Sequence, residues 1–402
     1  MKWEKVKLGE LYEVHNGLSK AGKFFGEGYP FLTFSTVFNN YFIPKQITDL
    51  VQSTEKEQES YSIRRGDVFV TRTSETSDEL GMSCVALKDY PMATYNGFTK
   101  RMRPITNRVF PEYIGYYMRL PSFRGEFRAF STMTTRASLR NEDLLGLEVK
   151  LPSIEIQKQI ADILSAYDDL IENNQKKIKL LEEAAQRLYK EWFVDLRFPG
   201  HENTKIVDGI PEGWQWCKVR DVADINSSAL PKNYKEDFID YVDLGSVRCG
   251  HIETRTRYNL NEAPGRAKRC AKDGDIIWGM VRPNLKAYAL VTNPKETDVF
   301  STGFAVLSAK KVPYSYLYCA VTQEEFVGYL VNATNGAAYP AVKPVHFEVA
   351  DILKPDDKVL EQFHSVADSI YRKKEALENQ NHNLRESRDL ILPKLMSGEV
   401  EV

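Results

Sequence analysis

The stretch LPSIEIQKQIADIL, residues Leu151–Leu164, decides the fold of this chain because it opens a long amphipathic segment. Pro152 breaks the segment before it, and Ser153 can cap the N-terminus of a new helix. From there apolar residues recur in alternating steps of four and three, the a/d spacing of a coiled coil, with one repeated step of four, a stutter. No glycine or proline interrupts the pattern until Pro199. The sequence therefore predicts a first long helix over residues 153–195.

The same pattern returns near the C-terminus, where KPDDKVLEQFHSVA begins at Lys354, an offset of 203 residues. Adding 203 to each apolar position of the first helix recovers the spacing, stutter included. The sequence therefore predicts a second long helix within residues 355–402, which Pro393 ends or kinks near the chain terminus.

Two helices that share one period, each following its own domain, are expected to pack on each other as an antiparallel coiled coil. The alternative is that each helix packs on its own domain. Polar seam residues such as Lys374 and Arg388 lower stability but can fix register and orientation. The predicted seam residues are Ile160, Ile163, Tyr167, Ile171, Asn174, Ile178, Leu181 and Leu188 in the first helix and Phe363, Val366, Ile370, Leu377, Asn381, Leu384 and Ile391 in the second.

Segments outside the helices repeat as well. Gly66-Asp67 in RRGDVFV recurs as Gly274-Asp275 in KDGDIIW, 208 residues later, and NGF at 96–98 returns as TGF at 302–304. A long-period duplication fixes the architecture before any strand is placed. We predict an α+β protein with two pseudo-repeated globular α+β domains, over residues 1–152 and, after a Pro/Gly-rich linker, within 196–354. Each is followed by one of the long helices, and the two helices form the antiparallel coiled coil.

The composition is that of an ordinary soluble protein. The 402 residues are 42% hydrophobic and 27% charged, and the sequence has no apolar run of about 18 residues, so no membrane contact is expected. The N-terminus alternates charged and apolar residues, which is not the pattern of a secretory signal. Five scattered cysteines without a CxxC pair indicate reduced thiols in a cytoplasmic protein.

The net charge of −2 conceals two basic stretches. Residues 98–140 contain nine Lys/Arg against two Asp/Glu, and residues 248–286 contain nine against four. Phosphate binding depends on local rather than total charge, so basic stretches in equivalent parts of two repeats favour a nucleic acid as partner. The alternative for each stretch is a solvated basic surface.

The sequence contains no catalytic constellation. It has no [ND]PP[YF] tetrapeptide for amino-methyl transfer, no Gly-rich loop for S-adenosylmethionine and no GxxxxGK[ST] for ATP. Pro355-Asp356-Asp357-Lys358 superficially resembles a nuclease motif but lies at a helix N-terminus, where acids favour the helix dipole. Cys249 and His251 offer two ligand types and no set of four for zinc. We expect no catalytic residue and no metal site.

The chain resembles the specificity subunits of type I restriction–modification enzymes. The resemblance rests on LPSIEIQKQIADIL, on PEGWQWCKVRDVADI at residues 211–225, on LRESRDLILPKLMSGEV at residues 384–400 and on the duplicated order of the domains. It spans essentially the whole chain. One departure is Asp357-Lys358-Val359, where the family favours a proline-rich start before the Glu361-Gln362 pair.

The resemblance implies a division of labour. Each globular domain is then a target-recognition domain that reads one half of a bipartite, asymmetric site on double-stranded DNA. The helices act as spacers that dock two methyltransferase (M) subunits, which carry S-adenosylmethionine, while restriction (R) subunits carry ATP and Mg. This chain itself holds no cofactor and is a non-catalytic subunit. The runner-up hypothesis is a coiled-coil adaptor that binds proteins without DNA specificity.

Two kinds of segment are predicted to contact DNA in each half. The first follows the Gly-Asp strand, and the second precedes each long helix. Arg and Asn side chains have the geometry to read guanine and adenine edges. Arg282, which precedes Pro283, has the alternative of bracing its own loop. The predicted DNA-binding residues are Arg72, Thr73, Ser74, Thr135 and Arg136 in the first half, with Lys100 and Arg101 as phosphate contacts, and Arg282, Asn284, Lys286, Tyr339 and Lys343 in the second half.

Overall fold

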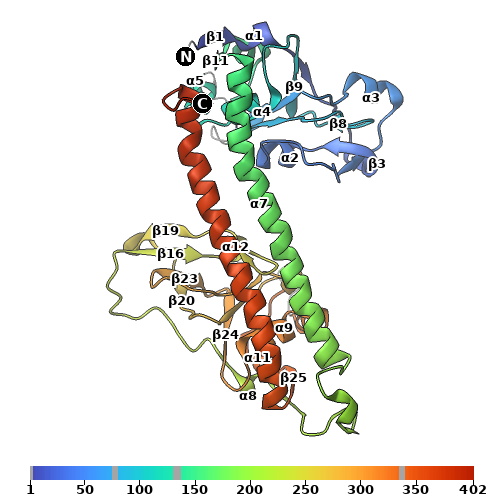
Figure 1. Cartoon of the computed structure of the whole chain (residues 1–402), viewed down its shortest axis with the longest axis vertical. Coiled ribbons are helices and arrows are strands. Elements are labelled where there is room, and N and C mark those ends of the chain that lie inside the picture. The colour runs from blue at the N-terminus through green and yellow to red at the C-terminus, as the bar shows by residue number, and fades with distance from the viewer. Residues whose placement is uncertain (1–2, 75–79, 130–136, 335–339) are drawn as a thin grey trace. The chain divides into compact units, whose positions relative to one another are not determined.

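The computed structural model of the chain describes residues 3–74, 80–129, 137–334 and 340–402 (Figure 1). The chain divides into two compact units. Unit 1 comprises Met1–Glu172 and Asn381–Val402, and unit 2 comprises Asn173–Gln380. The two long helices, α7 (Ile154–Tyr189) and α12 (Asp357–Ser397), each contribute a part to both units.

Unit 1 is built around a four-stranded antiparallel sheet of order β2-β9-β5-β7. Helix α4 begins with Pro111 at its first position, where the missing N–H costs nothing. The sheet residues Val68 and Met102 share one core with α4 and α5. The strands are β1 (Glu4–Lys7), β2 (Tyr12–Asn16), β3 (Phe25–Leu32), β4 (Leu50–Val51), β5 (Val68–Thr71), β6 (Thr73–Ser74), β7 (Ser83–Val85), β8 (Thr94–Tyr95), β9 (Thr99–Pro104), β10 (Ala137–Ser138) and β11 (Glu148–Leu151). The short helices are α1 (Leu8–Leu11), α2 (Phe34–Asn39), α3 (Glu55–Ser60), α4 (Pro111–Tyr117), α5 (Pro121–Ala129) and α6 (Asn141–Gly146).

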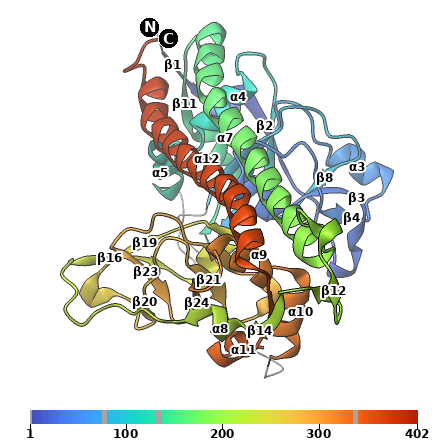
Figure 2. The ribbon, with the colours of Figure 1, turned by 60° about the horizontal axis from the view of Figure 1, so that its bottom comes forward.

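Unit 2 repeats this plan with a sheet of order β15-β24-β21-β22, and a second sheet of order β19-β16-β23-β20 lies in the same unit (Figure 2). The strands are β12 (Ile206–Val207), β13 (Ile210–Pro211), β14 (Gln215–Lys218), β15 (Ala223–Ile225), β16 (Phe238–Val242), β17 (Val247–Arg248), β18 (His251–Ile252), β19 (Thr256–Asn259), β20 (Ala267–Arg269), β21 (Ile276–Gly279), β22 (Tyr288–Leu290), β23 (Asp298–Ser301), β24 (Phe304–Ala309) and β25 (Asp351–Lys354). The short helices are α8 (Val219–Val222), α9 (Tyr314–Val321), α10 (Glu324–Asn332) and α11 (Pro344–Glu348), and a π-helical turn, η3 (Lys190–Val194), follows α7.

The Gly-Asp repeat occupies the same turn in both units. Gly66 and Gly274 have φ of 90° and 83°, in the left-handed region that glycine adopts without cost. Asp67 accepts the Arg64 N–H at 2.7 Å, and Asp275 accepts the Lys272 N–H at 2.9 Å. In each unit the turn leads directly into the central strands, β5 and β21. The duplication predicted from the sequence is therefore present in the fold.

The match between NGF and TGF is wrong by one residue. Thr99 lies opposite Thr71 in the β5–β9 pair, and Phe304 lies opposite Gly279 in the β21–β24 pair. The structural counterpart of Phe304 is therefore Thr99, not Phe98. Phe98 is 58% exposed whereas Phe304 is fully buried, so the two phenylalanines are not structurally equivalent.

Within each unit, α7 and α12 run antiparallel. In unit 1, Asp168 forms an ion pair with Arg388, and residues further back in α7 share a core with residues further on in α12, namely Ile160 and Leu164 with Leu392 and Leu395. In unit 2, the Asn174 amide donates to Gln380 Oε1 at 3.0 Å, the Glu182 carboxylate lies 2.7 Å from the Lys374 ammonium, and the Tyr189 and Phe363 rings lie 6.2 Å apart. In both units, residues later in α7 contact residues earlier in α12, which is the antiparallel arrangement that the sequence predicts.

Each helix also packs on the domain that precedes it. Tyr116 in α4 donates to Asp168 in α7 at 2.6 Å, and Cys319 in α9 lies 3.0 Å from the hydroxyl of Tyr371 in α12. Both residues of the second pair follow those of the first by 203 positions. The two alternatives are therefore both realised: each long helix packs on its own domain, and the two helices also pack on each other. Helix α12 continues past Pro393 to Ser397, so this proline does not end it.

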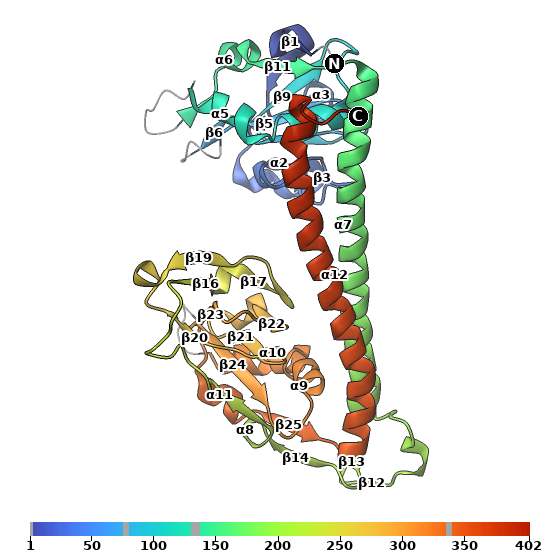
Figure 3. The same ribbon diagram turned by 60° about the vertical axis from the view of Figure 1, so that its left-hand side comes forward.

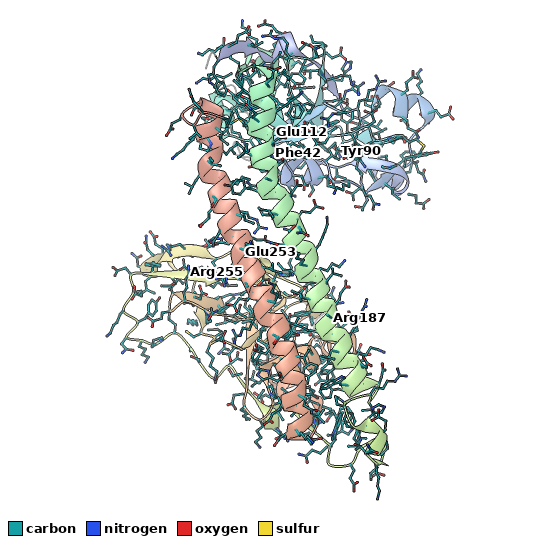
Figure 4. The ribbon with its side chains drawn as sticks, in the orientation of Figure 1. Phe42, Tyr90, Glu112, Arg187, Glu253 and Arg255 are labelled. Carbon is teal, nitrogen blue, oxygen red and sulfur yellow. The ribbon has the colours of Figure 1, made fainter. Side chains whose placement is uncertain are left out.

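Most predicted seam residues face the packed side of their helix. The buried ones are Ile160, Ile171, Asn174, Ile178, Phe363, Leu377 and Asn381, and the partly buried ones are Ile163, Tyr167, Leu181, Leu188, Ile370, Leu384 and Ile391. The prediction of Val366 as a seam residue is wrong, because its side chain is 46% exposed and the neighbouring Ala367 is buried instead. On the outer face of α7, Arg187 is largely solvated (Figure 4). In the described part of the chain, no helix combines the length and apolar character needed to cross a membrane.

Candidate nucleic-acid interface

In unit 1, the two segments predicted to contact DNA lie against each other. Strand β6 pairs antiparallel with β10, so Thr73 lies opposite Ser138, and the Leu139 N–H donates to the Arg72 carbonyl at 3.0 Å. Arg72, Thr73 and Ser74 therefore belong to one small ladder with the segment before α6. Thr135 and Arg136, predicted in the same segment, lie outside the described residues.

Unit 2 has the same connection at equivalent positions. The Val342 N–H donates to the Met280 carbonyl at 2.9 Å, and the Arg282 N–H donates to the Pro340 carbonyl at 2.8 Å. Val342 follows Leu139 by 203 residues and Met280 follows Arg72 by 208, the offsets of the two repeats. Two segments that the sequence presents as separate candidates are thus one site in each unit.

The loop after β21 has an unusual backbone. Arg282 and Lys286 flank the short turn η7 (Pro283–Leu285) and both are left-handed, with φ of 50° and 53°. This conformation costs a side-chain-bearing residue about 1–2 kcal/mol. Arg282 and Asn284 are exposed, as a base-reading side chain must be. Backbone strain of this kind is concentrated at functional sites.

Hydrogen bonds hold this loop from both sides. The backbone carbonyl of Lys286 accepts the Cys249 N–H at 2.9 Å, and the Lys286 ammonium forms an ion pair with Glu324 at 2.5 Å. That pairing reduces the charge that Lys286 offers to a phosphate. Tyr339, predicted at the same site, lies outside the described residues. Lys343 is exposed and directly precedes α11.

The prediction that Lys100 and Arg101 hold phosphates is wrong. Their exposed fractions are 5% and 3%. The Lys100 ammonium donates to the Asn141 side chain, and the Arg101 guanidinium donates to the Ser62 carbonyl at 2.8 Å. Burial lowers the pKa of both groups, and the nearby Arg72 lowers that of Lys100 further. Both are internal groups of β9, a central strand covered on both faces.

Acids from elsewhere in the chain neutralise much of the second basic stretch. Arg255 (labelled in Figure 4) lies 3.3 Å from Asp298, and Arg257 lies 2.9 Å from Asp240. The excess of cations counted along residues 248–286 therefore overstates the charge that this surface presents.

Two cations of that stretch were missed as individual candidates. Arg266 and Lys268 are exposed on either side of the buried Ala267 at β20. Neither has an acidic side chain within ion-pair distance in the part of the chain that the structure describes. Nothing in the sequence marks them beyond the basic stretch itself, because Arg266 precedes β20 and the β20–β23 pairing shifts its register between Ala267 and Arg269.

Comparisons with known proteins agree with this architecture. Residues 1–183 match the family model of the type I restriction modification DNA specificity domain. The chain is 26% identical to the type I restriction enzyme MjaIX specificity subunit of Methanocaldococcus jannaschii, over 100% of this chain and 94% of that protein. It is 21% identical to the HindI specificity subunit of Haemophilus influenzae, over 99% of each.

The fold is also found in a solved structure. The crystal structure of the type I restriction–modification system S subunit from M. genitalium matches 98% of this chain and 96% of that chain, with a TM-score of 0.57 at 14% identity. Together with the duplicated units and the antiparallel helices, these matches show what the chain is similar to: the specificity subunits of type I restriction–modification systems.

Proposed function

We propose that this chain is the DNA-specificity subunit of its system and that each globular domain reads one half of a bipartite DNA target. The observation that carries the proposal is the repeated connection between Arg72 and Leu139 in unit 1 and between Met280 and Val342 in unit 2. The same backbone frame presents different side chains in the two units. One fold used twice with different side chains suits a target with two unlike halves.

In unit 2 we assign base reading to the exposed Arg282 and Asn284, because both can form two hydrogen bonds to one base edge. Arg266 and Lys268 are exposed and have no ion-pair partner among the residues that the structure describes, which suits contacts to phosphates. Lys343 is exposed at the same site as Arg282 and serves as a further phosphate contact. In unit 1, Arg72 and the β6–β10 ladder take the corresponding place.

The antiparallel helices join the two readers. A helix pair of fixed length sets the number of unread base pairs between the half-sites, by the geometry that also governs dimeric DNA readers. We further propose that the helices dock two methyltransferase subunits, which bind S-adenosylmethionine, and that ATP and Mg act on the restriction subunits. On this proposal the chain alone neither methylates nor cleaves DNA.

Methylome sequencing of a host that carries this chain with its partner methyltransferase tests the proposal. The expected result is one methylated motif with two defined halves and an unread spacer. Binding of the purified complex to random duplexes should be sequence-selective and should weaken steeply with salt, because bound phosphates release counterions. Binding without sequence preference, together with an unmethylated genome, would instead favour the coiled-coil adaptor.

A further inference from the structure

A short hairpin of unit 2 reaches the two long helices. Strands β17 and β18 pair Val247 with Ile252 and Arg248 with His251, and Cys249 and Gly250 form the turn with φ of 39° and 93°. A Cβ on Gly250 would lie 2.8 Å from Glu182 Oε1 and 3.0 Å from the Tyr318 hydroxyl. The left-handed φ favours glycine at this position, and a Cβ there would displace the Glu182 carboxylate and the Tyr318 hydroxyl.

Four charged groups meet at this turn. The Lys374 ammonium of α12 lies 2.7 Å from Glu182 Oε1 of α7 and donates to the Gly250 carbonyl at 2.7 Å. His251 Nδ1 lies 2.8 Å from Glu378 Oε1 of α12, and its Nε2 lies 3.4 Å from Glu182 Oε2. The imidazole thus bridges one carboxylate from each helix, and Lys374, 5% exposed, lies between them.

The other groups around His251 carry no compensating charge. Glu182 lines a cavity of about 80 Å³ with Gln186, Cys249 and the rings of Tyr288, Tyr318 and Tyr371. Burial raises the pKa of Tyr288 to about 12, and it raises the pKa of Tyr318 and Tyr371 well above the usual 10. On the hairpin itself, Arg248 is paired with Glu253. With His251 protonated, two cations face two carboxylates; with His251 neutral, one carboxylate charge is left uncompensated.

We propose that His251 is a positioning residue: its ring contacts one carboxylate on each long helix and so holds the β17–β18 hairpin, and with it the second globular domain, in place on the helix pair. Figure 3 shows the ribbon of the domain that carries β17 beside α12. Unit 1 fastens α7 to α12 differently, through Asp168 and Arg388, whose guanidinium also lies over the Tyr41 ring at 5.2 Å. An arginine stays charged, so a rise in pH leaves the Asp168–Arg388 pair intact, whereas it can remove the charge of His251.

The direction of the pH effect follows from the carboxylates. Hydrogen bonds that the His251 ring donates to Glu182 and Glu378 raise its pKa from 6.5 to about 9, against the opposing effects of burial and Lys374. A raised pKa in the folded state means that the stabilisation is fully present below pH 6.5 and is lost as the pH rises through about 9. The hairpin should therefore be firmly seated at pH 7 and loosened at pH 10.

The first test follows the six histidines of the full chain by NMR after labelling of the imidazole rings. One resonance should titrate near pH 9 and should be absent from His251→Gln. The control is His382→Gln, whose exposed ring lies 3.2 Å from Glu386, one turn along α12. A His251 midpoint at or below 7 overturns the proposal.

The second test measures amide hydrogen exchange of residues 247–256, corrected for intrinsic exchange rates. Wild-type protection should fall at least tenfold between pH 7 and pH 10, while His251→Arg should stay protected at both because it keeps the cation. His251→Gln should be unprotected already at pH 7. Equal protection in the wild type and both variants shows that the ring has no positioning role.

The effect on recognition rests on the proposed function. In the complex with its partner subunits, His251→Gln should loosen selection at the second half-site and leave the first unchanged, and His251→Arg should restore it. If the exchange results hold and selection is unaffected, His251 seats the domain without influencing reading, which overturns this part of the inference. If no variant, wild type included, selects a sequence, the proposed function itself fails.

Discussion

The buried aspartates of the two repeats predict opposite responses to one substitution. Asp67 is fully buried and forms two hydrogen bonds with Arg103, at 2.8 and 2.6 Å. Asp275, its counterpart, is 2% exposed, and Ser308 stands where the first repeat has Arg103. Asp275 accepts the Lys272 N–H and has Ser308 as a side-chain hydrogen-bond partner, and no described cation lies within ion-pair distance of it. The first carboxylate is therefore ion-paired, whereas the second has neutral hydrogen-bond donors.

Replacing each aspartate with asparagine separates these situations. Asp67→Asn leaves the Arg103 guanidinium, whose side chain is only 17% exposed, without its counter-charge. Removing one partner of a buried pair costs about 3–5 kcal/mol. Asp275→Asn keeps an oxygen to accept the Lys272 N–H and removes an unpaired charge. Its unit should be unchanged or more stable by about 1 kcal/mol, because the neutral amide avoids the cost of burying a charge, and a pKa raised by one unit corresponds to about that much.

The pH dependence of the second site gives an independent check. Burial raises the pKa of Asp275, so the folded state holds this proton more tightly than the unfolded state. Stability at this site is therefore lost as the pH rises from about 4, the unfolded value, through the raised folded pKa. Asp275→Asn should abolish that loss.

Hydrogen exchange in a urea series measures both units in one sample, with peptides from β5 reporting on unit 1 and peptides from β21 on unit 2. Local reporting is necessary because a chain with two units need not unfold in one step. In each variant the unsubstituted unit is the internal control. Equal losses of stability in the two variants would refute the argument that Arg103 distinguishes the sites.

Three further predictions concern recognition. Replacing residues 1–152 with the corresponding domain of a relative should change one half of the methylated motif and keep the other; a change in both halves shows that the domains read jointly. Arg282→Ala should relax one base position at a cost of about 1–3 kcal/mol in selection experiments if Arg282 reads a base edge, whereas uniform weakening assigns it to a phosphate. Inserting four residues into α7 and four into α12, about one turn or 6 Å in each, should lengthen the unread spacer by one or two base pairs of about 3.4 Å, and an unchanged spacer in an active complex refutes the spacer role.

The sequence was sufficient to predict the repeats and the long helices because both leave patterns that survive divergence. The offset of 203 residues relates the helices and also the contacts Tyr116–Asp168 and Cys319–Tyr371, whose chemistry differs completely. Helix spacing is a local property of the chain. The residues that form the seam were harder to predict. Adding 203 to the positions of the first helix selected Val366, whereas the helix buries Ala367, a residue too small to stand out in an apolar pattern.

The charged residues show where sequence reasoning fails. Lys100 and Arg101 look like phosphate ligands in a basic stretch, yet both lie inside β9 with partners from residues about 40 positions away. Arg257 looks free until Asp240 is found beside it. The charge that a surface presents depends on acids brought in by the fold, and one sequence does not record those pairings. The sequence did not predict the charged cluster at His251 for the same reason, since its four charged groups come from three separate segments.

One ladder in each unit has a genetic consequence. Strand β1 pairs with β11, placing Glu4 opposite Leu151, and β14 pairs with β25, placing Gln215 opposite Lys354. The two ends of each globular domain therefore leave the fold side by side, at the base of the helix that follows. Recombination between related genes at these flanking strands would exchange a whole domain in one event. The incoming domain would have to match the helix contacts of the old one, such as Tyr116 with Asp168 in unit 1. New pairs of domains could then arise without stepwise mutation of either one.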